Sequence, residues 1–185
     1  MSNPYEVAVL IGSPRTKSFN RLLAKALTAI APPALSLRIV EIGDVPFYND
    51  EQEEALPAAW QTLRQDIARA DAVLFLTPEY NRGVPALLKN AVDVLSRPYG
   101  KSALTGKPGA VISTSPGAMG GFGANHHLRQ SLVCLGVNTM ATPEAYIGGV
   151  AGLFDEQGKL VNEASKDFLL KYLAAFEQWI GKIKS

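Results

Sequence analysis

The sequence predicts an α/β fold built on a mostly parallel, doubly wound sheet. Apolar runs of strand length alternate with segments whose apolar residues recur at helical spacing, which is typical of such folds. The run at 72–76 (AVLFL) is apolar on both faces, as expected of a central parallel strand with helices on each side. Prolines and glycines stand at the boundaries between these segments and mark where each one ends.

The first half of the chain is expected to hold three strands and two helices. The strands are expected near 5–11, 35–41 and 72–76, and the helices near 22–30 and 57–67. Pro32 and Pro33 end the first helix, and Pro57 is expected at the first position of the second, where its missing N–H costs nothing. The connection 42–56 carries the acidic stretch 50–54 and is interpreted as a solvated loop. The alternative is a flap over a site or a subunit contact.

The second half continues the alternation. Strands are expected near 110–113 and within 137–147, the latter interrupted by Pro143, and helices at 85–95, 124–135 and 165–183. Pro85 opens one helix, and Gly136 caps the end of the next. The resulting five strands and five helices are the inventory of a flavodoxin-like domain, with a five-stranded parallel sheet flanked by helices. The whole chain, 1–185, is expected to be a single domain.

Composition restricts the classes of partner. The formal net charge is +1 and no run of five basic residues occurs, so nothing indicates a nucleic-acid or membrane partner. The N-terminus does not read as a signal peptide, and no apolar run of 18 residues is present. Cys134 is the only cysteine, which is compatible with a reducing cytoplasm, where the protein is expected. Its apolar surroundings, 132–135, predict a small buried side chain.

Ligands of open parallel sheets bind beyond the carboxyl ends of the strands, where this sequence has three unusual loops. The first, 12–20, leads into a helix whose N-terminal N–H groups and dipole favour an anion. The loop offers hydroxyl donors from Ser13, Thr16 and Ser18, an amide donor from Asn20 and the guanidinium of Arg15, a set that favours a phosphate. The alternative is a plain helix cap at Ser18 with solvated cations around it.

The second and third loops suit a flat ligand. In the second, 77–85, two prolines and a glycine stiffen the backbone, and the residues of interest are Pro78, Glu79, Tyr80 and Asn81. In the third, 113–123, four glycines are expected to let the backbone approach something flat or bulky. Read alone, the second loop is better explained as a cap of the following helix, and the third is equally well explained as a flexible turn.

Two better-known phosphate motifs are absent. Neither GxxxxGK[ST] nor a GxGxxG after the first strand occurs, so nucleoside-triphosphate hydrolysis and a Rossmann-type site have little support.

The three loops in this order resemble the NADPH-dependent FMN reductase family, which includes quinone, chromate and azo-dye reductases. The segments that carry the resemblance are GSPRTKSFN, PEYNRGVPALLKNAVDVLSR and GKP…SPGAMGG. The resemblance implies FMN at the carboxyl edge of the sheet. By that pattern the phosphate is held by Ser13, Arg15, Ser18 and Asn20, and the ring and ribityl chain lie along Pro78, Glu79, Tyr80 and Asn81. Ser115 and Gly117 would close the other side. It further implies a homodimer or homotetramer.

The hypothesis for the activity is hydride transfer from NAD(P)H to flavin N5, followed by reduction of a quinone, free flavin, azo compound or chromate at the same place. One site used in turn predicts ping-pong kinetics. The flavin carries the chemistry, so no catalytic side chain and no metal is expected. The alternatives are a single-electron carrier without NAD(P)H activity and a regulatory domain for another phosphate ligand.

Two further features lie outside these loops. The adjacent His126 and His127 point about 100° apart on a helix, which makes a poor metal pair, so solvated or capping roles are expected. Arg129 and Glu144 could pair across a subunit interface.

Overall fold

The sheet of the computed structural model, which describes residues 3–185, has the strand order β2-β1-β3-β4-β5 with all neighbours parallel. Its strands are β1 (Tyr5–Ile11), β2 (Leu35–Val40), β3 (Ala72–Pro78), β4 (Pro108–Thr114), β5 (Asn138–Thr139) and β6 (Ala145–Ile147). The helices are α1 (Phe19–Ile30), α2 (Ala58–Arg69), α3 (Ala86–Leu95), α4 (Phe122–Cys134) and α5 (Glu163–Lys184). Two short 3₁₀ turns are η1 (Asp50–Gln52) and η2 (Val150–Leu153). This is the flavodoxin-like order, and the predicted fold class is confirmed.

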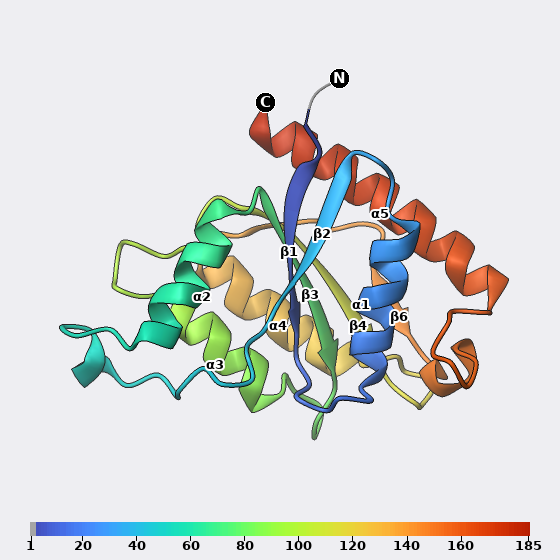
Figure 1. Cartoon of the computed structure of the whole chain (residues 1–185), viewed down its shortest axis with the longest axis horizontal. Coiled ribbons are helices and arrows are strands. Elements are labelled where there is room, and N and C mark those ends of the chain that lie inside the picture. Colours follow the sequence, from blue (N-terminus) through green and yellow to red (C-terminus); the bar gives the residue numbers. More distant parts are fainter. Residues whose placement is uncertain (1–2) are drawn as a thin grey trace.

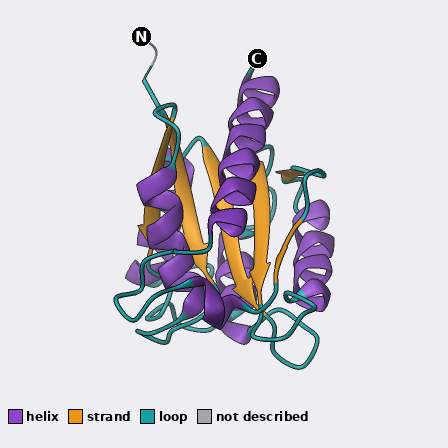
Figure 2. Cartoon of the chain, turned by 90° about the vertical axis from the view of Figure 1, so that its right-hand side faces the viewer, coloured by secondary structure: helices purple, strands orange, loops and turns teal. Residues whose placement is uncertain are grey.

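Helices cover both faces of the sheet. Helices α1 and α5 lie on one face, and α2, α3 and α4 lie on the other (Figure 1). Successive strand residues point to opposite faces, so Val7 and Val9 pack in the α1/α5 core while Ala8 and Leu10 pack in the other. The arrowheads of the strands point to the end of the molecule where the loops gather (Figure 2).

The fifth sheet position is shared by two short strands. Both β5 and β6 pair with β4, and the segment between them contains Pro143, which has no N–H for a ladder. The predicted interruption is therefore confirmed. Pro57 and Pro85 stand one position earlier than expected, at the N-caps of α2 and α3, where their backbone is extended.

The connection from β2 to α2 is better anchored than a solvated loop would be. The Asn90 side chain accepts a hydrogen bond from the Tyr48 N–H (2.8 Å) and donates to the carbonyl oxygens of Val45 and Pro46. The Tyr48 ring stacks on Trp60, with centroids 5.6 Å apart. The acidic stretch 50–54 itself is mostly exposed, so only that part agrees with the sequence-based interpretation.

The prediction that Cys134 is buried is wrong. Its side chain is exposed, as is that of Val133, because helical periodicity turns Leu132 inward and the next two residues outward. Among the described residues, no helix is both long and apolar enough to cross a membrane.

Candidate functional site

Three loops meet at the carboxyl edge of the sheet, and the register of the strands brings them together. They are the β1–α1 loop (12–18), the β3–α3 loop (79–85) and the β4–α4 loop (115–121). The Gly12 N–H donates to the Leu76 carbonyl oxygen (2.8 Å), so the first loop leaves the sheet beside β3. Pro78 lies opposite Thr114 in the ladder, so the second and third loops start side by side.

The β1–α1 loop presents two uncommitted hydroxyls. Ser13 and Ser18 are each only 4% exposed, yet neither side chain makes a hydrogen bond with any residue of 3–185. Ser18 occupies the N-cap position of α1, but its hydroxyl does not cap the helix. A plain cap, the alternative considered from the sequence, therefore does not describe this serine. The loop therefore holds two hydroxyl donors without partners in the described part of the chain, next to the N-terminus of α1, whose positive end favours an anion.

Asn20 adds a buried acceptor to this loop. Its side-chain N–H₂ donates to the Thr114 hydroxyl (2.9 Å) across the sheet edge. Its Oδ1 is buried and has no hydrogen-bond partner within residues 3–185. An acceptor of this kind is costly unless a ligand supplies a donor. The sequence predicts that Asn20 donates to a phosphate, and this stays a prediction. One of the two amide hydrogens is used for Thr114, and the oxygen has no partner among residues 3–185.

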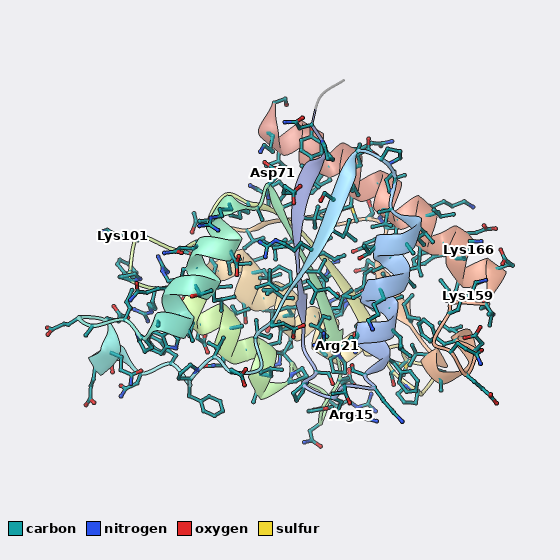
Figure 3. The ribbon with its side chains drawn as sticks, viewed as in Figure 1. Arg15, Arg21, Asp71, Lys101, Lys159 and Lys166 are labelled. Carbon is teal, nitrogen blue, oxygen red and sulfur yellow. The ribbon has the colours of Figure 1, made fainter. Side chains whose placement is uncertain are left out.

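Arg15 is the available arginine of the β1–α1 loop. It is exposed and forms no ion pair within the described part of the chain. Arg21, in the first turn of α1, is paired with Glu41 through two hydrogen bonds of 2.7 and 2.8 Å. The hydrogen bond from Arg21 lowers the pKa of the Glu41 carboxyl. Figure 3 shows Arg15 and Arg21 at one end of the sheet and Asp71 at the other.

The β3–α3 loop contains a tight turn with two left-handed residues. Tyr80 and Gly83 exchange backbone hydrogen bonds of 3.1 and 2.9 Å, and Asn81 and Arg82 have φ of 50° and 65°. This is the pattern of a type I′ turn, which is unfavourable for an arginine and is found where the surroundings enforce it. The turn leaves Tyr80 half exposed at the rim.

Helix α4 holds this turn in place. The Glu79 carboxylate accepts a hydrogen bond from the Ala124 N–H (3.0 Å) in the first turn of α4. A Cβ on Gly123 would lie 2.8 Å from the Arg82 carbonyl oxygen, so only glycine permits this approach. The Glu79 side chain thus joins the β3–α3 loop to α4.

Most glycines of the β4–α4 loop serve the protein's own packing. A Cβ on Gly120 would lie 2.4 Å from the Tyr146 carbonyl carbon, and one on Gly121 would lie 3.0 Å from the Ser113 side chain. Gly123 packs against the β3–α3 loop, as described above. Of the four glycines expected to admit a ligand, only Gly117 faces open space, with nothing nearer than the Ser115 hydroxyl at 3.6 Å. The other three approach the protein's own backbone and side chains.

Ser115 and Gly117 form a small turn of their own. The Ser115 hydroxyl accepts a hydrogen bond from the Gly117 N–H (3.0 Å), and its backbone is tied to Ile147 and Val150. The structure therefore brings Ser115 and Gly117 to the same edge as the other predicted residues, with Gly117 exposed.

Two site features escaped the sequence reasoning. Thr114 holds Asn20, and its place at the end of a buried strand was the available signal. Of the two histidines, His127 accepts a hydrogen bond from the Val84 N–H (3.3 Å), and His126 Nε2 lies 2.8 Å from the Tyr146 hydroxyl. Both rings are thus engaged rather than simply solvated, and helical spacing alone does not reveal these partners.

Arg129 is engaged within its own chain. Its guanidinium donates to the Asn125 side chain (2.8 Å) and to the Met140 carbonyl oxygen (2.9 Å). The sequence-based pair with Glu144 across an interface stays a prediction, and the Arg129 contacts seen here are to groups other than that carboxylate.

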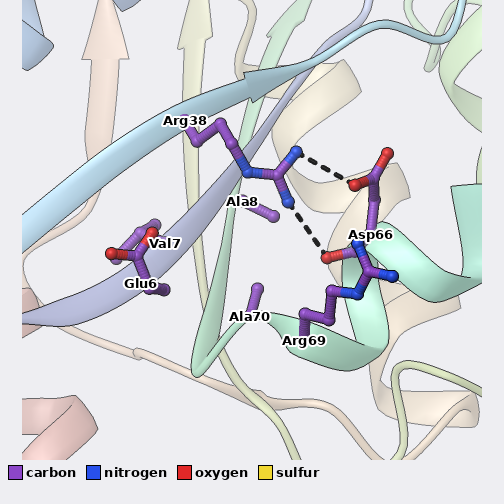
Figure 4. A pocket seen from close by; sticks show the side chains of 7 residues that line it. All are labelled: Glu6, Val7, Ala8, Arg38, Asp66, Arg69 and Ala70. Carbon is purple, nitrogen blue, oxygen red and sulfur yellow. Dashed lines mark hydrogen bonds and ion pairs between the residues drawn. The ribbon is translucent and has the colours of Figure 1, made fainter.

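Two hollows lie at opposite ends of the sheet, one beside the loops at the carboxyl ends of the strands and one toward the amino ends. A space of about 200 Å³ adjoins the β1–α1 loop and is lined by Ser13, Pro14 and the Arg21–Glu41 pair. A larger one of about 390 Å³ lies toward the amino ends of β1 and β3, lined by Glu6, Arg38 and Asp66 among others (Figure 4). In the larger hollow Arg38 is already paired with Asp66 (3.1 Å). Because ligands of parallel sheets bind at the carboxyl ends of the strands, the loop edge is the candidate site.

Comparisons with known proteins find relatives that match most of the chain. The family described as NADPH-dependent FMN reductase matches residues 5–152. A quinone reductase of Pseudomonas putida is 58% identical over 181 residues, covering 97% of both chains. A 2-hydroxy-1,4-benzoquinone reductase of a Burkholderia species is 41% identical, covering 95% of this chain and 96% of its own. Among solved structures, the flavoenzyme NAD(P)H:(acceptor) oxidoreductase FerB of Paracoccus denitrificans has a TM-score of 0.90 at 41% identity, covering 96% of this chain and 98% of its own.

Proposed function

Since this chain belongs to the family of NADPH-dependent FMN reductases, we propose that it is an FMN-dependent NAD(P)H:quinone oxidoreductase. The observation that carries the proposal is the set of unused polar groups at the start of α1. Ser13, Ser18 and the Asn20 Oδ1 are buried or nearly so, and all lack a partner within residues 3–185. A ligand with an anionic end and hydroxyl groups would satisfy them together.

FMN fits this donor and acceptor set. Its phosphate would accept hydrogen bonds from Ser13, Ser18 and Arg15 at the positive end of α1. A hydroxyl of its ribityl chain would supply the donor that the Asn20 oxygen lacks. The ring would lie between the segments 78–81 and 115–117, which the pairing of β3 with β4 places side by side. These assignments follow from the chemistry of the groups at this edge.

When bound, FMN supplies the ability to take a hydride from NAD(P)H and to pass two electrons to an acceptor. The residues of the chain bind and orient. Arg15 and the serines anchor the charged end, and the Tyr80–Gly83 turn forms a stiff wall beside the ring. Tyr80 is half exposed and stands at the entrance that NAD(P)H and the acceptor share.

We further propose that NAD(P)H and the acceptor use this entrance in turn. Initial rates measured at several fixed acceptor concentrations should then give parallel double-reciprocal lines. Intersecting lines would show that both substrates bind together and would remove the ping-pong proposal. Quinones are the first acceptors to test, followed by free flavin, an azo dye and chromate.

The direct test is a titration of flavin-free protein with FMN, followed by anaerobic addition of NADPH. The proposal predicts a yellow 1:1 complex whose absorbance bleaches with NADPH and returns when a quinone is added. Protein that neither carries nor takes up FMN would end the proposal. FMN binding without NAD(P)H oxidation would instead favour the single-electron carrier, a class that is usually strongly acidic for docking, whereas this chain has a net charge of +1.

We also propose that the protein forms a homodimer or homotetramer. The supporting observation is a hollow of about 470 Å³ beside α4 that is lined by apolar and polar groups, including Tyr99 and Leu135. Tyr99 is 90% exposed and Val133 is 72% exposed, which is unusual for large apolar side chains. Light scattering on the purified protein decides the point, and a monomer at micromolar concentration would exclude it.

A further inference from the structure

We propose that His127 is a proton-sensitive positioning residue for the flavin-binding edge. In its neutral form it holds the β3–α3 loop, and on taking up a proton it releases that loop and weakens FMN binding. The second part rests on the proposed function, whereas the first concerns the protein alone.

The imidazole of His127 is seated on the loop. Its Nδ1 accepts a hydrogen bond from the Val84 N–H (3.3 Å), and a Cβ added to Gly83 would lie 3.1 Å from the same nitrogen. Gly83 closes the turn in which Asn81 and Arg82 are left-handed. The ring therefore touches the last residue of the turn and bonds to the residue after it.

Helix α4 makes two hydrogen bonds to the β3–α3 loop. At the start of the turn, the Glu79 carboxylate accepts from the Ala124 N–H (3.0 Å). At its end, Val84 donates to His127. The internal bonds between Tyr80 and Gly83 preserve the shape of the turn but do not fix where it sits. Loss of the His127 contact would leave the loop hydrogen-bonded to α4 only through Glu79, beside the close packing of Gly123 on Arg82.

The contact depends on the protonation state of the ring. Nδ1 accepts a hydrogen bond only while it carries no proton, which requires the neutral form with its hydrogen on Nε2. In the imidazolium both nitrogens are donors, so Nδ1–H and the Val84 N–H would face each other. The change from acceptor to donor at this nitrogen follows from the chemistry of the imidazole ring when it takes up a proton.

The charged side chains around His127 form ion pairs with one another. On α3, Lys89 and Asp93 line the hollow that His127 also lines, and they pair with each other at 2.6 Å. In the loop, Arg82 pairs with Glu79 at 3.5 Å. On α4 itself the titratable neighbours are His126, whose ring is bonded to Tyr146, and Cys134 in the same hollow. In each of these ion pairs the two charges cancel, so neither pair leaves a free negative charge to attract the protonated ring in place of the lost hydrogen bond.

The first test uses the flavin-free protein and the backbone amide of Val84. Nuclear magnetic resonance between pH 5.5 and 8.0 should show the Val84 amide losing its hydrogen-bonded shift and its exchange protection as the His127 ring titrates. His127→Asn places an amide oxygen near the position of Nδ1, so this variant should keep the contact at every pH. His127→Ala should lack it at every pH. His126→Ala is the matched control and should behave as the wild type at Val84.

The second test measures the Kd of FMN at the two ends of that range. The wild type should bind about three- to tenfold more weakly at pH 5.5 than His127→Asn does, the size expected for loss of one neutral hydrogen bond. At pH 8.0 the two should agree within about twofold. Comparison at equal pH removes the titration of the FMN phosphate itself, whose second pKa is near 6.

The outcomes separate the two proposals. Absence of FMN binding at both pH values would reject the proposed function, and the Val84 amide would still decide the role of His127. The inference would be overturned if the chemical shift and exchange protection of the Val84 amide did not change with pH. Identical pH profiles of the Kd for FMN in wild type and His127→Asn would also overturn it. So would a change in oligomeric state in His127→Ala by light scattering, because the residue would then act at a subunit contact instead.

Discussion

Replacing Arg15 by alanine should weaken FMN binding while leaving the fold untouched. Arg15 is exposed and has no partner among residues 3–185, so its loss leaves no protein group unpaired. The free energy of unfolding of the flavin-free protein should stay within about 0.5 kcal/mol of the wild type. What is lost is a charge-assisted hydrogen bond to the phosphate, about 1.5–3 kcal/mol. That corresponds to an increase in Kd of about 10- to 150-fold.

The assay is quenching of FMN fluorescence during titration with flavin-free protein at 0.15 M salt. Lys17→Ala removes the same charge from the same loop and is the matched control. Because the Debye length is about 8 Å at this salt concentration, an exposed charge without a contact should change Kd by less than about threefold. Arg15→Lys keeps the charge but not the planar fork, and should fall between the two. Equal losses for Arg15→Ala and Lys17→Ala, or no loss for either, would refute the placement of Arg15.

Two further predictions concern stability. Gly120→Ala should lower the free energy of unfolding in urea by about 2 kcal/mol or more, because φ is +59° there and the new Cβ would lie 2.4 Å from the Tyr146 carbonyl carbon. Gly117→Ala meets open space and should change it by less than about 0.5 kcal/mol; equal effects of the two would contradict the packing described. The folded-state pKa of Glu41 is lowered by its hydrogen bond from Arg21, so the unfolded chain takes up this proton at a higher pH than the folded protein. Stability should therefore fall as the pH drops from about 5 to 3, less steeply in Glu41→Gln than in the wild type, and identical slopes would show that the pair contributes nothing.

The order of elements could be predicted from the sequence because each is marked by local chemistry. The strand at 72–76 is apolar on both faces, and Pro32, Pro85 and Gly136 delimit helices by rules that act within a few residues. The same rules predicted the interruption near Pro143. Cys134 was misplaced because the apolar stretch around it was taken as a whole, whereas in a helix only every third or fourth residue faces inward.

The candidate site was predictable in position but only partly in detail. The carboxyl ends of β1, β3 and β4 had to meet once the sheet was parallel, so the three loops could be found without coordinates. Contacts between residues distant in the chain could not be predicted from the sequence. That Gly120 makes room for the backbone of Tyr146, or that the Asn20 amide bonds to Thr114, depends on residues distant in the chain. No local pattern in either partner indicates such a contact.

The most direct measurement of the central claim compares FMN with riboflavin, which lacks the phosphate, in titrations of the flavin-free protein. If the start of α1 anchors the phosphate, FMN should bind in a 1:1 complex and riboflavin should bind at least about 100-fold more weakly, the loss expected for two or more charge-assisted hydrogen bonds. Equal affinities, or no binding of either flavin, would contradict the account.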